Sequence, residues 1–82
     1  MATIIKSDGT HIENYNHSGL KAKQDAVGGY IEPVYTQKWV VLVNEEGLLK
    51  NLPPNIEVSK MVGTPIVGDA LVLTHAEWNA QN

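Results

Sequence analysis

The stretch 44–55 collects most of the polar side chains that could contact a small ligand. Amides and a lysine can recognise phosphate and ribose groups, and a helix that begins after Asn55 would add free N–H groups. Tyr30 follows the pair Gly28-Gly29, where the backbone can approach a ligand closely and the ring can stack on a planar base. The candidate ligand-binding residues are therefore Tyr30, Asn44, Glu45, Lys50, Asn51 and Asn55.

The same residues also have structural explanations, which remain open from the sequence. Asn55 is a suitable cap for the helix that follows a stiff Pro-Pro connector, and Glu57 in the first turn would compete with a bound anion. The two glycines can simply end a helix. Glu45-Glu46 fits a solvated turn better than a paired carboxylate site, because adjacent strand residues point to opposite faces.

Catalytic and metal-binding patterns are weak. His11, His17 and His75 lack the i, i+4 spacing typical of metal ligands, and the chain has no cysteine to supply a thiolate. Ser18 follows His17 directly, but we expect it to cap a helix rather than act as a nucleophile. We therefore predict a binding protein rather than an enzyme, with no catalytic residue, metal or cofactor.

Length and composition limit the class of protein. The 82 residues predict a single domain over 1–82, and the net charge of −3 without any arginine argues against binding duplex nucleic acid. The apolar runs are too short for a signal peptide or a membrane span, so we expect a cytoplasmic protein with no membrane partner. A small domain without disulfides often relies on oligomerisation, which predicts a homo-oligomer.

The elements expected to position these residues begin with a hairpin, 2–6 and 11–15, around Asp8-Gly9. A helix over 19–27 should follow, capped by Ser18 and stopped by Gly28. Next come a strand over 30–36, which Pro33 places at a sheet edge or interrupts with a bulge, and a central apolar strand over 39–44. Residues 48–50 are expected to return as a short strand.

The second half continues with a helix over 56–62, capped by Asn55 and closed by Gly63, and a strand over 70–73. Thr74 and Glu77 have the spacing of a capping box and predict a short C-terminal helical turn. The order ββαββαβ predicts an α+β fold with a mixed or antiparallel sheet.

Three segments, VGGYIEPV (27–34), VNEEGLLKNLPPN (43–55) and GTPIVGDALVL (63–73), carry a resemblance. Together they resemble an uncharacterised family of small proteins common in bacteriophages, plasmids and other mobile elements. The resemblance covers about 4–73, and the tail from Thr74 onward lies outside it. It implies a phage or mobile-element origin, and hence the host cytoplasm, but no established activity.

Phages carry small oligomeric proteins that sequester nucleotide signals of host immunity, and this chain is similar to them in general type. The first hypothesis is therefore a phage-encoded anti-defence protein that binds a cyclic nucleotide or ADP-ribose derivative between subunits without cleaving it. The absence of arginine counts against this ligand class. The alternative is an interaction module that inhibits a host protein through an acidic, aromatic surface. A small signal-degrading hydrolase is a third hypothesis.

Overall fold

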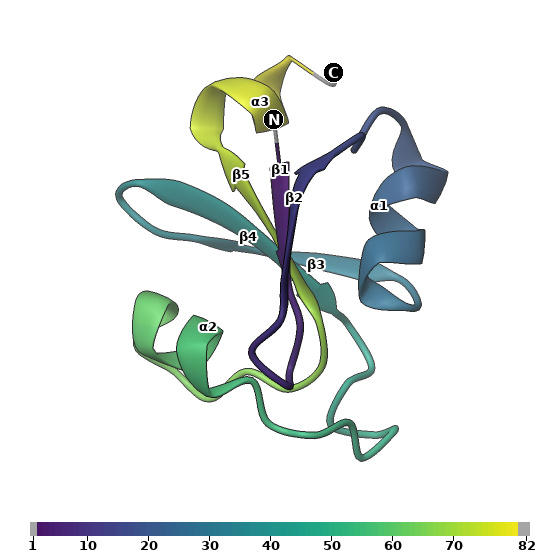
Figure 1. Cartoon of the computed structure of the whole chain (residues 1–82), viewed down its shortest axis with the longest axis vertical. Helices are drawn as coiled ribbons and strands as arrows, with labels where there is room; N and C mark the ends of the chain where they lie inside the picture. Colours follow the sequence, from purple (N-terminus) through teal and green to yellow (C-terminus); the bar gives the residue numbers. More distant parts are fainter. Residues whose placement is uncertain (1, 81–82) are drawn as a thin grey trace.

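The computed structural model describes residues 2–80 and forms one twisted sheet flanked by three short helices (Figure 1). The predicted α+β class and element order are confirmed. In chain order the elements are β1 (Ala2–Ile5), β2 (His11–Tyr15), α1 (Leu20–Val27), β3 (Ile31–Tyr35), β4 (Trp39–Asn44), α2 (Ile56–Val62), β5 (Ala70–Thr74) and α3 (His75–Asn79).

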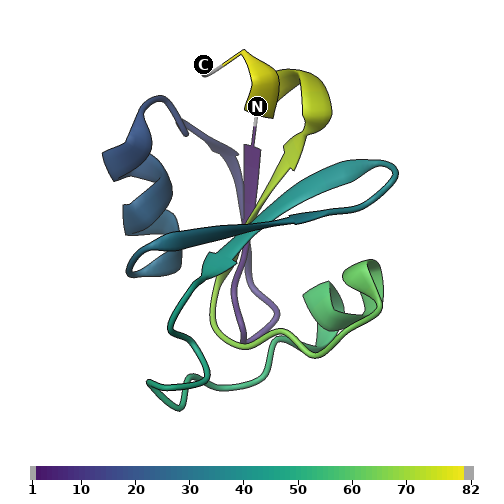
Figure 2. The same cartoon turned by 180° about the vertical axis from the view of Figure 1, so that it is seen from behind.

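The sheet is entirely antiparallel, with the strand order β2-β1-β5-β4-β3. Of the two sheet types left open by the sequence, the antiparallel one is therefore correct. β4 lies between β5 and β3 and is buried from Val40 to Asn44, as its continuous apolar run predicts. The β3–β4 hairpin crosses the direction of β1 and β5 at a steep angle, which both views show (Figures 1 and 2).

β3 is an edge strand, which is one of the two arrangements that Pro33 predicts. Glu45 donates its N–H to the Tyr30 carbonyl, and Thr36 donates its N–H to the Trp39 carbonyl. Because hydrogen-bonded pairs alternate along an antiparallel ladder, residues 32 and 34 also bond β4, and residues 31, 33 and 35 turn their backbone groups outward. The N–H that Pro33 lacks would therefore have faced away from the sheet.

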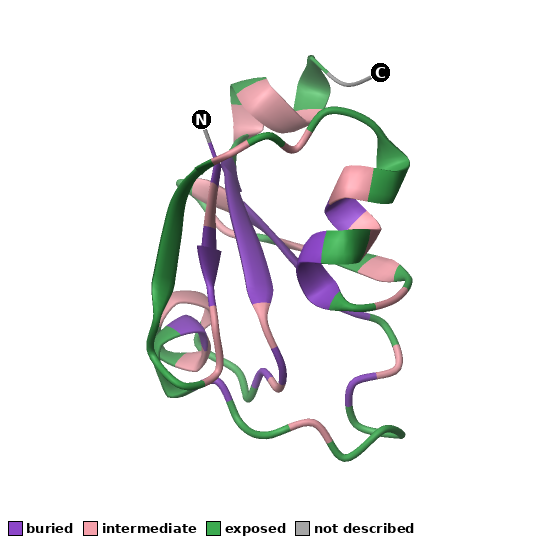
Figure 3. Ribbon diagram, turned by 45° about the vertical axis from the view of Figure 1, so that its right-hand side comes forward, coloured by how far each residue is buried: buried purple, intermediate pink, exposed green. Residues whose placement is uncertain are grey.

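Two apolar clusters lie on opposite faces of the sheet, and α1 and α2 lie on the two sides (Figure 3). Ala26 and Val27 of α1 pack on the face that presents Leu42 and Leu71, and Trp78 of α3 packs against the same cluster. Val58 of α2 packs on the other face. The two faces follow from the two-residue alternation of side chains along β4 and β5, so that each face has its own helical cover.

The helix ends follow local sequence rules at α2 and α3. α2 runs over the predicted residues, with the Asn55 side chain accepting the Val58 N–H at its start and Gly63 in the left-handed conformation at its end. α3 begins with the predicted capping box of Thr74 and Glu77. The longest helix has eight residues, and nothing helical within residues 2–80 has the length and apolarity to cross a membrane.

Two local predictions are wrong. Ser18 does not cap α1: Gly19 occupies the N-cap with φ 86° and no side-chain cap bond, while the Ser18 N–H bonds the Asn16 side chain. Both Ser and Gly are accepted at an N-cap, and the positive φ needed here favours glycine. Residues 48–50 form no strand, because the Lys50 N–H bonds back to the Glu46 carbonyl and closes a turn.

Candidate functional site

The end of α1 and the turn after β4 enclose a shallow hollow of about 450 Å³, here the Tyr30 hollow. Tyr30 is 64% exposed beside it. Gly29 allows the side chains of Asn44 and Lys50 to approach closely, since a Cβ would lie 2.9 Å from Asn44 Nδ2 and 3.2 Å from Lys50 Nζ. The lining residues are Gln24, Asp25, Gly28, Gly29, Tyr30, Glu46 and Lys50.

Asn44 lies buried beneath this hollow and holds its two walls together. Its Nδ2 donates to the Val27 carbonyl at 3.2 Å, and its Oδ1 accepts the Glu46 N–H at 2.8 Å. The side chain thus links the end of α1 to the turn after β4. A buried amide used in this way has a structural role, because it fixes the end of α1 against the turn that carries Lys50.

The charge in the Tyr30 hollow does not favour phosphate. Lys50 is the one cation among its lining residues, and its Nζ lies 3.7 Å from Glu46 Oε1. Asp25 adds a second carboxylate. A phosphate would therefore compete with Glu46 for Lys50 and would be repelled by both carboxylates.

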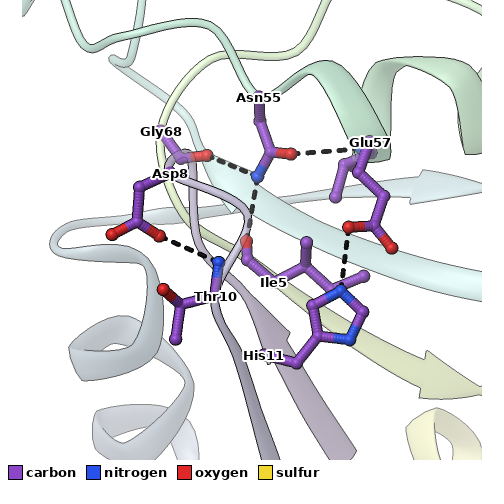
Figure 4. A network of polar contacts seen from close by, with 8 residues as sticks. Ile5, Asp8, Thr10, His11, Asn55, Glu57 and Gly68 are labelled. Atoms are coloured by element: carbon purple, nitrogen blue, oxygen red, sulfur yellow. Dashed lines mark hydrogen bonds and ion pairs between the residues drawn. The ribbon is translucent and has the colours of Figure 1, made fainter.

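Asn55 lies elsewhere and has a structural role (Figure 4). Its side chain is 1% exposed, and its Nδ2 donates to the carbonyls of Ile5 at 2.9 Å and Gly68 at 3.0 Å. Its Oδ1 accepts the Val58 N–H at 3.1 Å. One amide therefore caps α2 and ties it to the end of β1 and the loop before β5.

The remaining predicted ligand-binding residues, Asn51 and Glu45, also lie outside the Tyr30 hollow. Asn51 is exposed in the turn after β4, with φ 54°, a conformation that asparagine tolerates better than most residues. Glu45 lines a different cavity on the far side of that turn. The structure thus brings Tyr30, Asn44 and Lys50 together and leaves Glu45, Asn51 and Asn55 outside the Tyr30 hollow.

The cavity at Glu45 has a volume of about 460 Å³ and is here called the leucine groove. Leu48 and Leu49 line it and are 78% and 83% exposed. The groove lies between the turn after β4, the β3–β4 hairpin and the loop before β5. Its lining residues are Glu32, Val34, Val43, Asn44, Glu45, Gly47, Leu48, Leu49, Thr64, Pro65, Ile66 and Val67.

Backbone bonds hold the turn that presents these leucines. The Gly47 N–H bonds the Asn44 carbonyl, and the Leu52 N–H bonds the Gly47 carbonyl. A Cβ on Gly47 would lie 2.8 Å from Val67 Cγ2, so the turn packs directly on the loop before β5. The two leucines therefore project from a turn that backbone hydrogen bonds and packing on Val67 hold in place.

Sequence reasoning missed the leucine groove because it assigned 48–50 to a strand. The available signal was the position of Leu48 and Leu49 between the turn residues Gly47 and Asn51. Two large apolar residues inside a turn have no strand or helix face to bury them. Such a pair is a stronger indication of a contact surface than of a core segment.

The three histidines have different partners, and His75 Nε2 lies 2.7 Å from the Thr36 carbonyl oxygen. His11 of β2 bonds Glu57 at 2.8 Å, and His17 Nε2 lies 3.9 Å from Glu77 Oε2. Lys23 is buried and donates to the His17 carbonyl, and this burial lowers the pKa of the Lys23 ammonium. Within residues 2–80, no three potential metal ligands converge.

The model of a family described as a domain of unknown function, DUF3846, matches residues 1–80. The chain belongs to this family. The DUF3846 match runs past Leu73, where the resemblance was expected to end, so the capping box and α3 belong to the family domain. Neither the curated proteins nor the solved structures give a match to the chain.

Proposed function

We propose that this DUF3846 protein is a small interaction module that binds a partner protein through the leucine groove. The observation that carries the proposal is the exposure of Leu48 and Leu49 beside an apolar cavity. Contiguous apolar surface rimmed by polar residues is typical of protein–protein contact sites. Burial of each leucine by a partner would contribute about 1.5–3 kcal/mol from removal of apolar area from water.

The rigidity of the turn also supports this proposal. Leu48 and Leu49 belong to a segment closed by backbone hydrogen bonds and packed on Val67. A contact surface that is already ordered loses little conformational entropy on binding. The leucines contribute little to folding while exposed, so their side chains are available for an intermolecular contact.

The biological setting that we propose rests on the resemblance of the three sequence segments to small proteins of phages and mobile elements. In that setting the chain is an anti-defence protein in the host cytoplasm, and its partner is a host protein whose activity it blocks. This role needs no catalytic group in the chain, since occupation of a partner surface is enough to inhibit it.

The test compares two matched surface variants in affinity capture from host lysate. We expect wild-type protein to retain one partner in stoichiometric amount and the double variant Leu48→Ser/Leu49→Ser to lose it. Leu20→Ser is the control, because Leu20 is 60% exposed on α1, outside the groove. Retention of the same partner by the double variant would refute the proposal.

A second candidate function is sequestration of a nucleotide-derived signal at the Tyr30 hollow. The exposed Tyr30 ring beside Gly29 favours stacking with a base, and Lys50 Nζ lies at the same place. The two carboxylates of the hollow oppose this function, so a second subunit of a homo-oligomer would have to supply further cations.

Native mass spectrometry with a panel of cyclic dinucleotides and ADP-ribose derivatives tests this second candidate. We expect a retained ligand whose binding is lost in Tyr30→Ala and unchanged in Tyr35→Ala, a control tyrosine that is also exposed. Heat denaturation should return the ligand intact, which separates sequestration from hydrolysis. No retained ligand across the panel would rule the candidate out.

A further inference from the structure

We infer that the partner segment held by the leucine groove carries a large apolar side chain flanked by lysine or arginine. This inference rests on the proposed function and adds the chemistry of the partner. Its basis is the combination of an apolar cavity with two carboxylates, Glu32 of β3 and Glu45 after β4, which are the only charged residues that line it.

The two carboxylates are free to meet a partner's cation. Neither Glu32 nor Glu45 forms an ion pair with any other residue among 2–80, whereas Glu46 is held by Lys50 and Glu57 by His11. Both residues are exposed. Complementary charge at the rim of an interface favours partners of opposite sign and excludes those of like sign.

The apolar part of the groove accounts for the large apolar side chain that we infer in the partner segment. Val34, Val43, Ile66, Leu48 and Leu49 are among the apolar residues that line the groove. A volume of about 460 Å³ lies within the range of about 300–1,000 Å³ typical of pockets that enclose a bound group. A leucine, methionine or aromatic side chain can therefore enter as an anchor.

The edge of β3 argues for docking through side chains rather than by addition of a strand. Residues 31, 33 and 35 direct their backbone groups away from the sheet, and Pro33 supplies no N–H to that edge. An added strand would lose the central donor of the edge. The groove beside Glu32 offers contacts that do not depend on the missing donor.

The charge of the chain argues against a second copy as the occupant. The net charge is −3, so two copies repel each other before contact. Lys23 is buried and Lys50 already faces Glu46, which removes two of the six lysines from any contact with the groove of another copy. A cationic segment of a different protein fits the two carboxylates better.

The test is selection of peptides from a random display library on the immobilised protein, followed by affinity measurement on the peptides obtained. We expect enrichment of sequences with a large apolar residue next to lysine or arginine. The double variant Glu32→Gln/Glu45→Gln should bind them about five- to tenfold more weakly, as expected for two exposed charge pairs. Glu13→Gln on β2 is the control and should bind like wild type, because Glu13 is exposed outside the groove.

The outcomes separate the inference from the proposed function. Peptides that need Leu48 and Leu49 but lack basic residues, or bind the glutamine double variant as tightly as wild type, overturn the inference and leave the proposed function standing. Peptides that bind the Leu48→Ser/Leu49→Ser variant unchanged, or a failure to enrich any peptide, overturn the proposed function. Circular dichroism confirms that each variant is folded.

Discussion

Asn55→Ala is the substitution whose cost the structure defines best. The change removes the acceptor for the Val58 N–H and the donor to the carbonyls of Ile5 and Gly68. Loss of an N-cap costs about 1 kcal/mol, and each of the two amide bonds to buried carbonyls contributes about 1 kcal/mol. The expected loss in free energy of unfolding is therefore about 3 kcal/mol.

That loss is a large part of the total free energy of unfolding. A chain of this length typically has a free energy of unfolding of about 4–12 kcal/mol. The midpoint of thermal unfolding should fall by about 12–24 °C. Urea titration followed by tryptophan fluorescence measures the change directly.

Two further variants separate the cap from the bonds to the carbonyls. Thr74→Ala removes the N-cap of α3, which is exposed, and should cost only about 1 kcal/mol. Asn55→Asp keeps an acceptor for Val58 but loses the amide donor and places a carboxylate against two carbonyls, so it should remain strongly destabilised. Equal losses for Asn55→Ala and Thr74→Ala, or wild-type stability of Asn55→Asp, would refute the reasoning.

Three other substitutions test separate features. Gly29→Ala should cost about 1 kcal/mol in urea titration, because its Cβ would displace the Asn44 amide from the Val27 carbonyl. The Thr10 N–H bonded to the Asp8 carboxylate holds the pKa of that carboxyl below its ordinary value of 3.8. This contribution to stability is present above the ordinary pKa and is lost as pH falls through the lowered one, so the urea midpoint of Asp8→Asn should fall less on acidification than that of wild type. Pro33→Val should add an outward N–H to the β3 edge and increase self-association in sedimentation velocity, whereas an unchanged sedimentation profile would show that the missing donor does not limit pairing at this edge.

Local signals in the sequence predicted most of the secondary structure. The bounds of α2, its Asn55 cap and its Gly63 stop were predictable because each depends on hydrogen bonds within a few residues. The capping box at Thr74 was predictable for the same reason. Pro33 predicted either an edge strand or a bulge, because both tolerate a missing N–H, and the structure shows the edge position.

The wrong predictions arose where two local solutions were equally acceptable. Ser18 and Gly19 are both common N-cap residues, and the path of the chain from β2 into α1 selected the one that adopts a positive φ. Leu48 and Leu49 can form a strand only where a neighbouring strand is available to pair with their backbone groups. The turn bonds between residues 44 and 52 form instead, and the leucines stay exposed.

The candidate site depended on contacts that no local pattern encodes. Asn44 and Glu45 are neighbours in the sequence and both line the leucine groove, yet only Asn44 also anchors the floor of the Tyr30 hollow through its bond to the Val27 carbonyl. The Asn44 side chain is buried and linked to α1, whereas Glu45 follows the strand and is exposed. Asn55 was predicted both as a cap and as a ligand-binding residue. In the structure its amide caps α2 through the Val58 N–H and donates to the carbonyls of Ile5 and Gly68, which is a structural role.

The sequence by itself determined the α+β class, the order of the elements and the ends of α2, because these follow from periodicity and from hydrogen bonds between near neighbours. Only the tertiary structure decided which polar residues meet. The sheet order β2-β1-β5-β4-β3 and the packing of Gly47 on Val67 bring Glu32, Glu45 and the two leucines to one groove. Such a surface depends on contacts between segments far apart in the chain.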